Sequence, residues 1–173
     1  VGEVAVDTET TSLDPHQADL VGISLCSKIG KACYIPVGHK SPKCLKKDAV
    51  IKKLKKILED PSIKKIGQNI KFDFIVFYKC GITLSSMEDT MLMSYVLDAG
   101  KNRHNMDTLS EIHLGHKTIS FKEMVGTGKK EINFSEVELD KAKDYAAEDV
   151  DVTFRLYKKF IKNLKSEKMI NIY

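Results

Sequence analysis

The chain has 173 residues, of which 42% are hydrophobic and 30% are charged, and its formal net charge at pH 7 is +4. A chain of this length can bury a substantial apolar core, which predicts one globular domain over residues 1–173. The apolar runs are too short to cross a bilayer and no cleavable leader is recognisable, so we expect a cytoplasmic protein without a membrane partner. The mild positive charge permits a nucleic-acid partner without requiring one.

The four cysteines show no CxxC pairing and lie among apolar residues. This distribution favours buried thiols in a reducing compartment over disulfides or a zinc site. The first residue is Val1 rather than Met, and the first predicted strand begins almost at once. We therefore expect a domain that belongs to a longer protein.

Three predicted strands joined by short turns come first and can pair as antiparallel neighbours, and helices then alternate with short strands. The predicted elements are strands at 4–9, 19–26 and 31–37, a helix at 47–59, a strand at 64–68, a helix at 69–80, a short strand at 82–84, and helices near 88–98 and 105–115. This order predicts an α/β layer architecture that contains a mixed sheet.

The C-terminal segment carries the most strongly patterned helix. Ser135 and Glu138 have the spacing of a capping box, and Phe134 and Leu139 have that of a hydrophobic staple, which predicts the start of the helix. Small and apolar residues then recur at three- and four-residue steps, and a bend near the lysines stays open. The predicted core stripe comprises Leu139, Ala142, Ala146, Val150, Thr153, Tyr157, Phe160 and Leu164.

Asp7 and Glu9 are two residues apart on the first predicted strand, so both side chains leave the same face, about 6.5 Å apart along the backbone. They lie at the carboxyl end of the strand, where open α/β sheets commonly bind ligands, and the pair can share a cation. Taken alone, this pair fits equally well a strand end that turns polar as it meets water.

Asp73 follows a predicted helix N-cap at Asn69 and lies on the apolar face of the 69–80 helix, together with Ile70 and Phe74. Taken alone, a carboxylate in the first turn that the helix dipole favours is the simpler account. A buried carboxylate, however, needs a cation or a hydrogen-bond partner. The position on the apolar face therefore favours a metal ligand.

Tyr145 and Asp149 are one turn apart on the last predicted helix, and Asp149 lies at the edge of the core stripe. A tyrosine in this position can hydrogen-bond to a water at a metal, whereas the alternative is a half-buried tyrosine beside a surface aspartate. The four acids each lie inside or at the end of a segment patterned for burial. Together they predict bound divalent metal and a nuclease.

The segments DTETTSLD, GQNIKFD and YAAEDVDVT resemble the three exonuclease motifs of the DEDD superfamily, in its tyrosine subtype. The segments YIPVGH, RHNMDTLSE and HKTISFKE further resemble the 3′-5′ proofreading exonuclease domain of bacterial DNA polymerase I, over nearly the whole chain. The resemblance implies a ribonuclease H-like fold, an α/β architecture whose mixed five-stranded sheet is flanked by α-helices. It also implies an enzyme that hydrolyses DNA from the 3′ end.

The resemblance assigns a role to each catalytic residue. Asp7 bridges two divalent ions, Glu9 and Asp149 bind the ion on the nucleophile side, Asp73 serves the second ion largely through water, and Tyr145 orients the attacking water. Two cations about 4 Å apart relieve the repulsion between an anionic nucleophile and a phosphodiester. Oxygen ligands favour Mg²⁺ or Mn²⁺, and none of the five histidines lies in a motif.

The resemblance also implies contacts to a single-stranded DNA 3′ end from Leu13, Gln68, Asn69, Phe72, Arg103 and Phe121. Leu13 lies in a polar loop and can wedge between terminal bases, and Phe121 can stack on a base. Residue type alone favours a loop leucine that covers the core and a core phenylalanine instead.

A covalently linked polymerase domain is the implied partner, and the exonuclease domain itself is expected to be monomeric. Two other functions stay open: an inactive scaffold or DNA-binding module inside a polymerase, and an exoribonuclease of the same superfamily with the same five catalytic residues. All the motif acids are retained, which argues against the scaffold. The resemblance outside the motifs favours DNA as the substrate.

Overall fold

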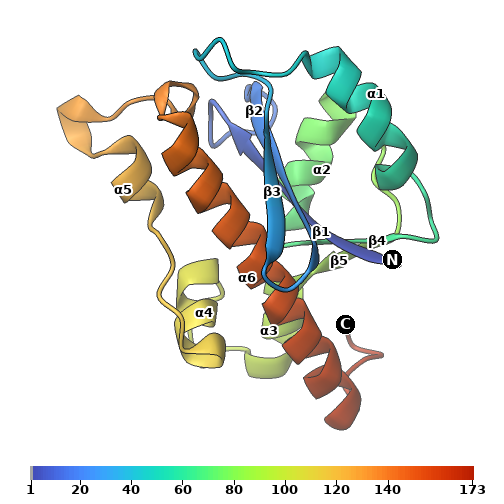
Figure 1. Cartoon of the computed structure of the whole chain (residues 1–173). Helices are drawn as coiled ribbons and strands as arrows, with labels where there is room; N and C mark the ends of the chain where they lie inside the picture. The colour runs from blue at the N-terminus through green and yellow to red at the C-terminus, as the bar shows by residue number, and fades with distance from the viewer. Residues whose placement is uncertain (1) are drawn as a thin grey trace.

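The computed structural model describes residues 2–173 and contains a five-stranded sheet with helices on both faces (Figure 1). The antiparallel strands are β1 (Glu3–Thr10), β2 (Leu20–Lys28) and β3 (Lys31–Pro36), and β4 (Lys64–Gly67) and β5 (Met87–Asp89) continue the sheet in parallel with β1. The spatial order is β3-β2-β1-β4-β5. The predicted mixed five-stranded sheet flanked by helices is confirmed.

The helices form two layers because alternate side chains of β1 point to opposite faces of the sheet. Val6 belongs to the apolar core under α1 and α2, whereas Ala5 belongs to the core under α3, α4 and α6. The helices are α1 (Lys47–Leu58), α2 (Ile70–Lys79), α3 (Thr90–Asp98), α4 (Met106–Leu114), α5 (Phe121–Val125) and α6 (Leu139–Ser166), with short 3-10 turns η1 (Gly128–Lys130) and η2 (Phe134–Glu136). Asp7 and Glu9 therefore emerge on the α6 side of the sheet, and Thr8 emerges on the α2 side.

The long helix α6 runs continuously past the sheet, without the break near its lysines that the sequence left open (Figure 1). The predicted core stripe is buried apart from Leu139, which is partly exposed. The predicted capping box at Ser135 and Glu138 is wrong. Asn133 and Glu136 form the box two residues earlier, around η2, because the chain bends at the buried Val137 before α6 begins.

The predicted strand at 82–84 is also wrong. Ile82 and Leu84 are buried against the ends of α1 and α2, but the backbone of Thr83 bonds to the Glu59 carboxylate (2.9 Å) instead of to a strand. The fifth strand is β5, so the helix predicted near 88–98 begins at Thr90. Apolar content marked the buried segment correctly but could not indicate which backbone groups pair.

The cysteines agree with the prediction only in part. All four thiols are free, and Cys26 is buried, but Cys33 is exposed, because β3 is an edge strand and its side chain leaves the sheet. Cys44 and Cys80 are partly exposed. None of the helices in residues 2–173 has the length and apolarity that crossing a membrane requires.

Candidate active site

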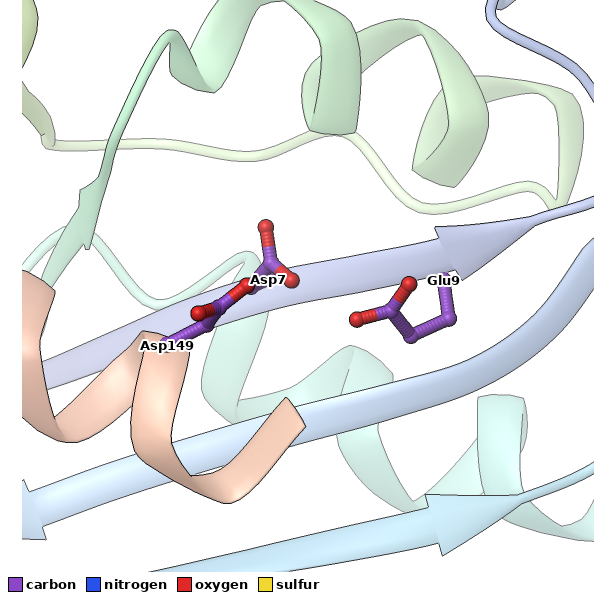
Figure 2. A group of neighbouring side chains, drawn as sticks. All are labelled: Asp7, Glu9 and Asp149. Atoms are coloured by element: carbon purple, nitrogen blue, oxygen red, sulfur yellow. The ribbon is translucent and has the colours of Figure 1, made fainter. Parts of the chain in front are cut away.

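Two elements bring three carboxylates together. β1 presents Asp7 and Glu9 to the face that α6 covers, and α6 places Asp149 against them, with the carboxyl group of Glu9 turned back toward the other two (Figure 2). One oxygen from each of the three side chains lies within 4.8 Å of the others. This spacing allows the three carboxylates to share one cation.

Asp73 reaches the same pocket from α2, on the opposite side of β1. Its Oδ1 accepts hydrogen bonds from the backbone N–H of Thr8 (2.9 Å) and from the Thr8 hydroxyl (2.6 Å), and its side chain is only 2% exposed. Thr8 lies between Asp7 and Glu9 in the sequence, and strand alternation turns it toward α2. β1 therefore supplies Asp7 and Glu9 on the α6 face of the sheet. It also supplies Thr8, which holds Asp73 on the α2 face.

The four carboxylates raise one another's proton affinity. Burial raises the pKa of Asp7 to about 6 and raises the pKa values of Glu9, Asp73 and Asp149 well above the ordinary range, and the nearby negative charges raise these three further. The hydrogen bonds from Thr8 oppose this shift in the pKa of Asp73. Without a cation, the group therefore resists full ionisation at neutral pH.

The residues of this group fit a divalent cation. Asp149 Oδ1 is buried and has no hydrogen-bond partner within residues 2–173, a costly arrangement for a carboxylate oxygen. Every ligand atom in the group is a carboxylate oxygen, the donor that Mg²⁺ and Mn²⁺ prefer. A bound cation would provide the missing partner of Asp149 and offset the repulsion among the acids.

Tyr145 lies one turn before Asp149 and packs against the rings of Phe134 and Phe121, whose centroids are 6.0 and 6.3 Å from its own. Burial, followed by the charge of Asp149, raises the pKa of the Tyr145 hydroxyl above its ordinary value. The phenol therefore stays protonated and remains a hydrogen-bond donor at the edge of the carboxylate group.

These side chains surround an open pocket of about 530 Å³. The predicted site residues that line it are Asp7, Glu9, Leu13, Gln68, Asn69, Phe72, Asp73, Phe121, Tyr145 and Asp149. Of the predicted residues within 2–173, Arg103 alone is outside this lining; it is exposed and precedes His104, whose carbonyl oxygen accepts from Gln68 Nε2 (2.8 Å). The pocket therefore gathers residues from β1, α2, α5 and α6.

The rim of the pocket exposes apolar side chains. Leu13 is 88% exposed, so the alternative of a leucine that covers the core is wrong. Phe121 is 40% exposed and stacks on Phe134, with ring centroids 6.1 Å apart and planes at 6°, so it is neither a fully buried core residue nor a free side chain. Both residues present apolar surface to the pocket.

Asn69 is the N-cap residue of α2, as predicted, but its side chain does not cap the helix. The carboxylate of Asp89 accepts from the N–H groups of Asn69 and Ile70 instead. The reason is the left-handed backbone of Asn69 (φ 59°, ψ 46°), because a capping side chain normally requires extended backbone. The Asn69 side chain is thus left at the pocket.

Several supporting residues were not found from the sequence. Thr8 holds Asp73, Asn133 Nδ2 donates to the Thr11 carbonyl (2.9 Å) in the loop before Leu13, and Glu148 accepts from the Ile119 N–H (2.6 Å) ahead of Phe121. The contact partners are far apart in the chain. The available signal was the position of Thr8 and Glu148 directly beside motif acids.

Comparison with known proteins shows the family of the chain. The family model of the 3′-5′ exonuclease matches residues 1–165. DNA polymerase I of Pseudomonas aeruginosa is 44% identical over 169 residues, which cover 94% of this chain and 18% of that protein. The chain spans about a fifth of the length of the curated relatives it matches.

Solved structures show the same fold. NrnC of Brucella melitensis, solved with bound Mg²⁺, has a TM-score of 0.77 at 24% identity, over 99% of this chain and 77% of that one. RNase D of Escherichia coli, an exoribonuclease involved in structured RNA processing, has a TM-score of 0.74 at 20% identity, over 98% and 41% of the chains. The fold is thus ribonuclease H-like, and the family match over residues 1–165 shows that the chain belongs to the 3′-5′ exonuclease family of DNA polymerase I.

Proposed function

We propose that this chain is a metal-dependent 3′-5′ exodeoxyribonuclease domain that removes nucleotides from single-stranded or frayed DNA, as proofreading inside a longer DNA polymerase. The supporting observation is the convergence of Asp7, Glu9 and Asp149, with ligand oxygens within 4.8 Å, beside Asp73 and Tyr145 in one open pocket. An inactive scaffold has no need to keep these buried acids together, because their mutual repulsion destabilises the fold.

The carboxylates divide into two binding positions in this proposal. Asp7, Glu9 and Asp149 would hold one divalent ion, and Asp7 together with Asp73 would serve a second. Asp73 Oδ1 accepts both hydrogen bonds from Thr8, so Oδ2 is the atom that would serve a second ion, directly or through water. When bound, the two cations neutralise the phosphodiester and stabilise the charge that develops as the bond to the 3′ oxygen breaks.

Tyr145 orients the attacking water. Its hydroxyl stays protonated because burial and the charge of Asp149 both raise its pKa, so it can donate a hydrogen bond to the water oxygen. The neighbouring rings of Phe121 and Phe134, which stack on each other, restrict its movement. A water held by this hydroxyl would be positioned for attack before the reaction begins.

The rim of the pocket binds the unpaired end of the strand. Leu13 and Phe121 offer apolar surface on which an unstacked base can pack, and such contacts do not depend on base identity. A base held in a duplex is already stacked and paired, so the pocket selects single-stranded or frayed ends. Gln68, Asn69 and Phe72 line the same pocket and are the proposed contacts to the strand. Arg103 lies outside the lining, in the loop whose His104 carbonyl accepts from Gln68, and is proposed to contact the strand beyond the pocket.

The test is degradation of a single-stranded DNA labelled at its 5′ end, with Mg²⁺ or Mn²⁺, with a chelator, and beside an RNA of the same sequence. We expect a metal-dependent ladder that shortens from the 3′ end on DNA and is absent for Asp149→Asn. Degradation of the RNA alone would make the chain an exoribonuclease. A folded protein that binds no metal and cleaves neither substrate would make it a scaffold.

A further inference from the structure

The turn at residues 67–70 carries two of the proposed strand contacts, Gln68 and Asn69, and leads into α2. Its backbone is constrained: Asn69 has left-handed dihedral angles, which a residue with a side chain adopts at an energetic cost. Gly67 is packed so tightly that a Cβ there would lie 2.8 Å from the Cβ of Ile70. Because Asn69 does not cap the helix itself, other residues must hold this turn in place.

One buried carboxylate holds the turn from outside the pocket. Asp89 accepts hydrogen bonds from the N–H groups of Asn69 (3.0 Å), Ile70 (3.1 Å) and Met91 (2.9 Å), and it is 6% exposed. It therefore lies at the N-termini of both α2 and α3, where the helix dipoles stabilise a negative charge. Its own N–H donates to the Tyr173 hydroxyl (2.8 Å), which fixes β5 at the open edge of the sheet.

The next residue, Thr90, holds the side chain of Gln68. Its fully buried hydroxyl lies 3.1 Å from the Gly67 carbonyl oxygen and 2.5 Å from Gln68 Oε1. The Gln68 amide nitrogen donates in turn to the carbonyl oxygen of His104. Both ends of the Gln68 amide are therefore fixed, and the loop that contains Arg103 is attached to the same network.

We infer that Asp89 and Thr90 are positioning residues that hold the turn at 67–70 in the conformation that binds the DNA strand. Within residues 2–173, neither residue lines the active-site pocket, so they act through Gln68 and Asn69. The three N–H donors also distinguish Asp89 from the metal-binding group, where Asp149 Oδ1 has no partner among the described residues. The inference rests on the proposed function, since it names how that site grips its substrate.

The test is Asp89→Asn, which keeps the shape but places an NH₂ group against one of the three N–H donors. We expect the KM for short single-stranded DNA to rise about tenfold while kcat stays within about threefold, because β1 and α6 are unchanged. The control is Asp60→Asn, which changes an aspartate that also accepts from a backbone N–H, that of Ser62 (2.8 Å), in a turn away from the pocket. This control should leave KM unchanged.

Two further measurements separate this inference from the proposed function. Hydrogen exchange without metal or DNA should show the Asn69 and Ile70 amides exchanging at least about tenfold faster in Asp89→Asn, with α6 unchanged. Affinity for single-stranded DNA in chelator should fall about tenfold in the same variant, a comparison that needs no catalysis. If Asp89→Asn proves unfolded, Thr90→Val, which removes only the hydroxyl, should raise KM about threefold.

Equal KM and equal DNA affinity in the folded variants and the wild type would overturn the inference, and so would a loss of kcat with KM unchanged. Wild-type protein that binds DNA without cleaving it contradicts the proposed hydrolysis only, and the affinity and exchange comparisons still decide the role of Asp89. Wild-type protein that binds no DNA would overturn both.

Discussion

The buried acids on the two faces of β1 differ in how many hydrogen-bond donors surround them. On the α6 side, Asp7, Glu9 and Asp149 crowd together, and Asp149 Oδ1 has no partner within the described residues. On the α2 side, Asp73 is held by the N–H and hydroxyl donors of Thr8, and Asp89, at the end of β5, is likewise held by N–H donors. A buried carboxylate that several donors hold can position the backbone around it, whereas a crowded group of carboxylates with fewer donors needs a cation.

The largest loss of exonuclease activity is expected from a substitution among the carboxylates on the α6 side. Asp7→Asn should reduce exonuclease activity on the order of 10³-fold or more, because Asp7 is shared by both proposed ion positions and each ion supplies several kcal/mol of charge stabilisation. The measurement is the rate of release of the 3′ nucleotide at saturating Mg²⁺. Asp48→Asn on the exposed face of α1 is the matched control, and comparable activity in the two variants would remove Asp7 from the site.

The same group should make the metal-free protein less stable as pH rises. The folded protein binds protons more tightly than the unfolded chain, since the pKa of Asp7 rises from 3.8 to about 6 and those of the other three acids rise too. The free energy of unfolding should therefore fall by at least about 2 kcal/mol between pH 4 and pH 7, the amount that the shift in the pKa of Asp7 alone supplies. Denaturant unfolding in chelator measures this fall.

Asp7→Asn sharpens the stability test. It should flatten the pH dependence and raise the stability of the metal-free protein at pH 7, although the variant is inactive. Added Mg²⁺ should stabilise the wild type more at pH 7 than at pH 5. A wild-type stability that is independent of pH and of Mg²⁺ would show that these carboxylates form no cation site.

On the α2 side, Thr8→Val tests whether the hydrogen bonds from Thr8 position Asp73. The change removes the hydroxyl bond to Asp73 (2.6 Å) but keeps the backbone bond, so we expect kcat to fall about tenfold and stability to fall by about 1 kcal/mol. Thr153→Val is the control, because this buried hydroxyl donates only to the sulfur of Met106. Steady-state kinetics and thermal unfolding provide both readouts.

The smallest change in activity is expected from a substitution on the rim of the pocket, away from the buried acids. Leu13→Ala should raise the KM for single-stranded DNA about three- to tenfold without changing stability, because the side chain is 88% exposed and packs on little protein. Ile172→Ala, at 72% exposure near the C-terminus, is the matched control. A loss of thermal stability in Leu13→Ala would instead assign this leucine a structural role.

The sequence predicted that Asp7, Glu9 and Asp149 lie together on the α6 side of the sheet, for physical reasons. Strand alternation fixes the shared face of Asp7 and Glu9, and helical periodicity places Asp149 beside the core stripe, so local rules suffice. The hydrogen bonds that hold Asp73 and Asp89 could not be predicted from the sequence. Asp73 was placed on its apolar face correctly, but its bond to Thr8 and the bond of Asp89 to Asn69 join residues 65 and 20 positions apart.

The errors in the fold have the same origin. Both Asn133/Glu136 and Ser135/Glu138 satisfy the local spacing of a capping box, and only the packing of Val137 decides between them. Likewise, the apolar residues at 82–84 mark burial, but strand pairing selects β5 at Met87–Asp89. Patterns that several segments satisfy locally are resolved by tertiary contacts.

The most direct test of this account is a crystal structure of the protein with Mn²⁺, in which anomalous scattering locates the ions. We expect one ion among the carboxylates of Asp7, Glu9 and Asp149, and a second beside Asp7 on the side of Asp73, while the bonds from Thr8 to Asp73 persist. A structure at saturating Mn²⁺ with no ion between β1 and α6 would contradict the account.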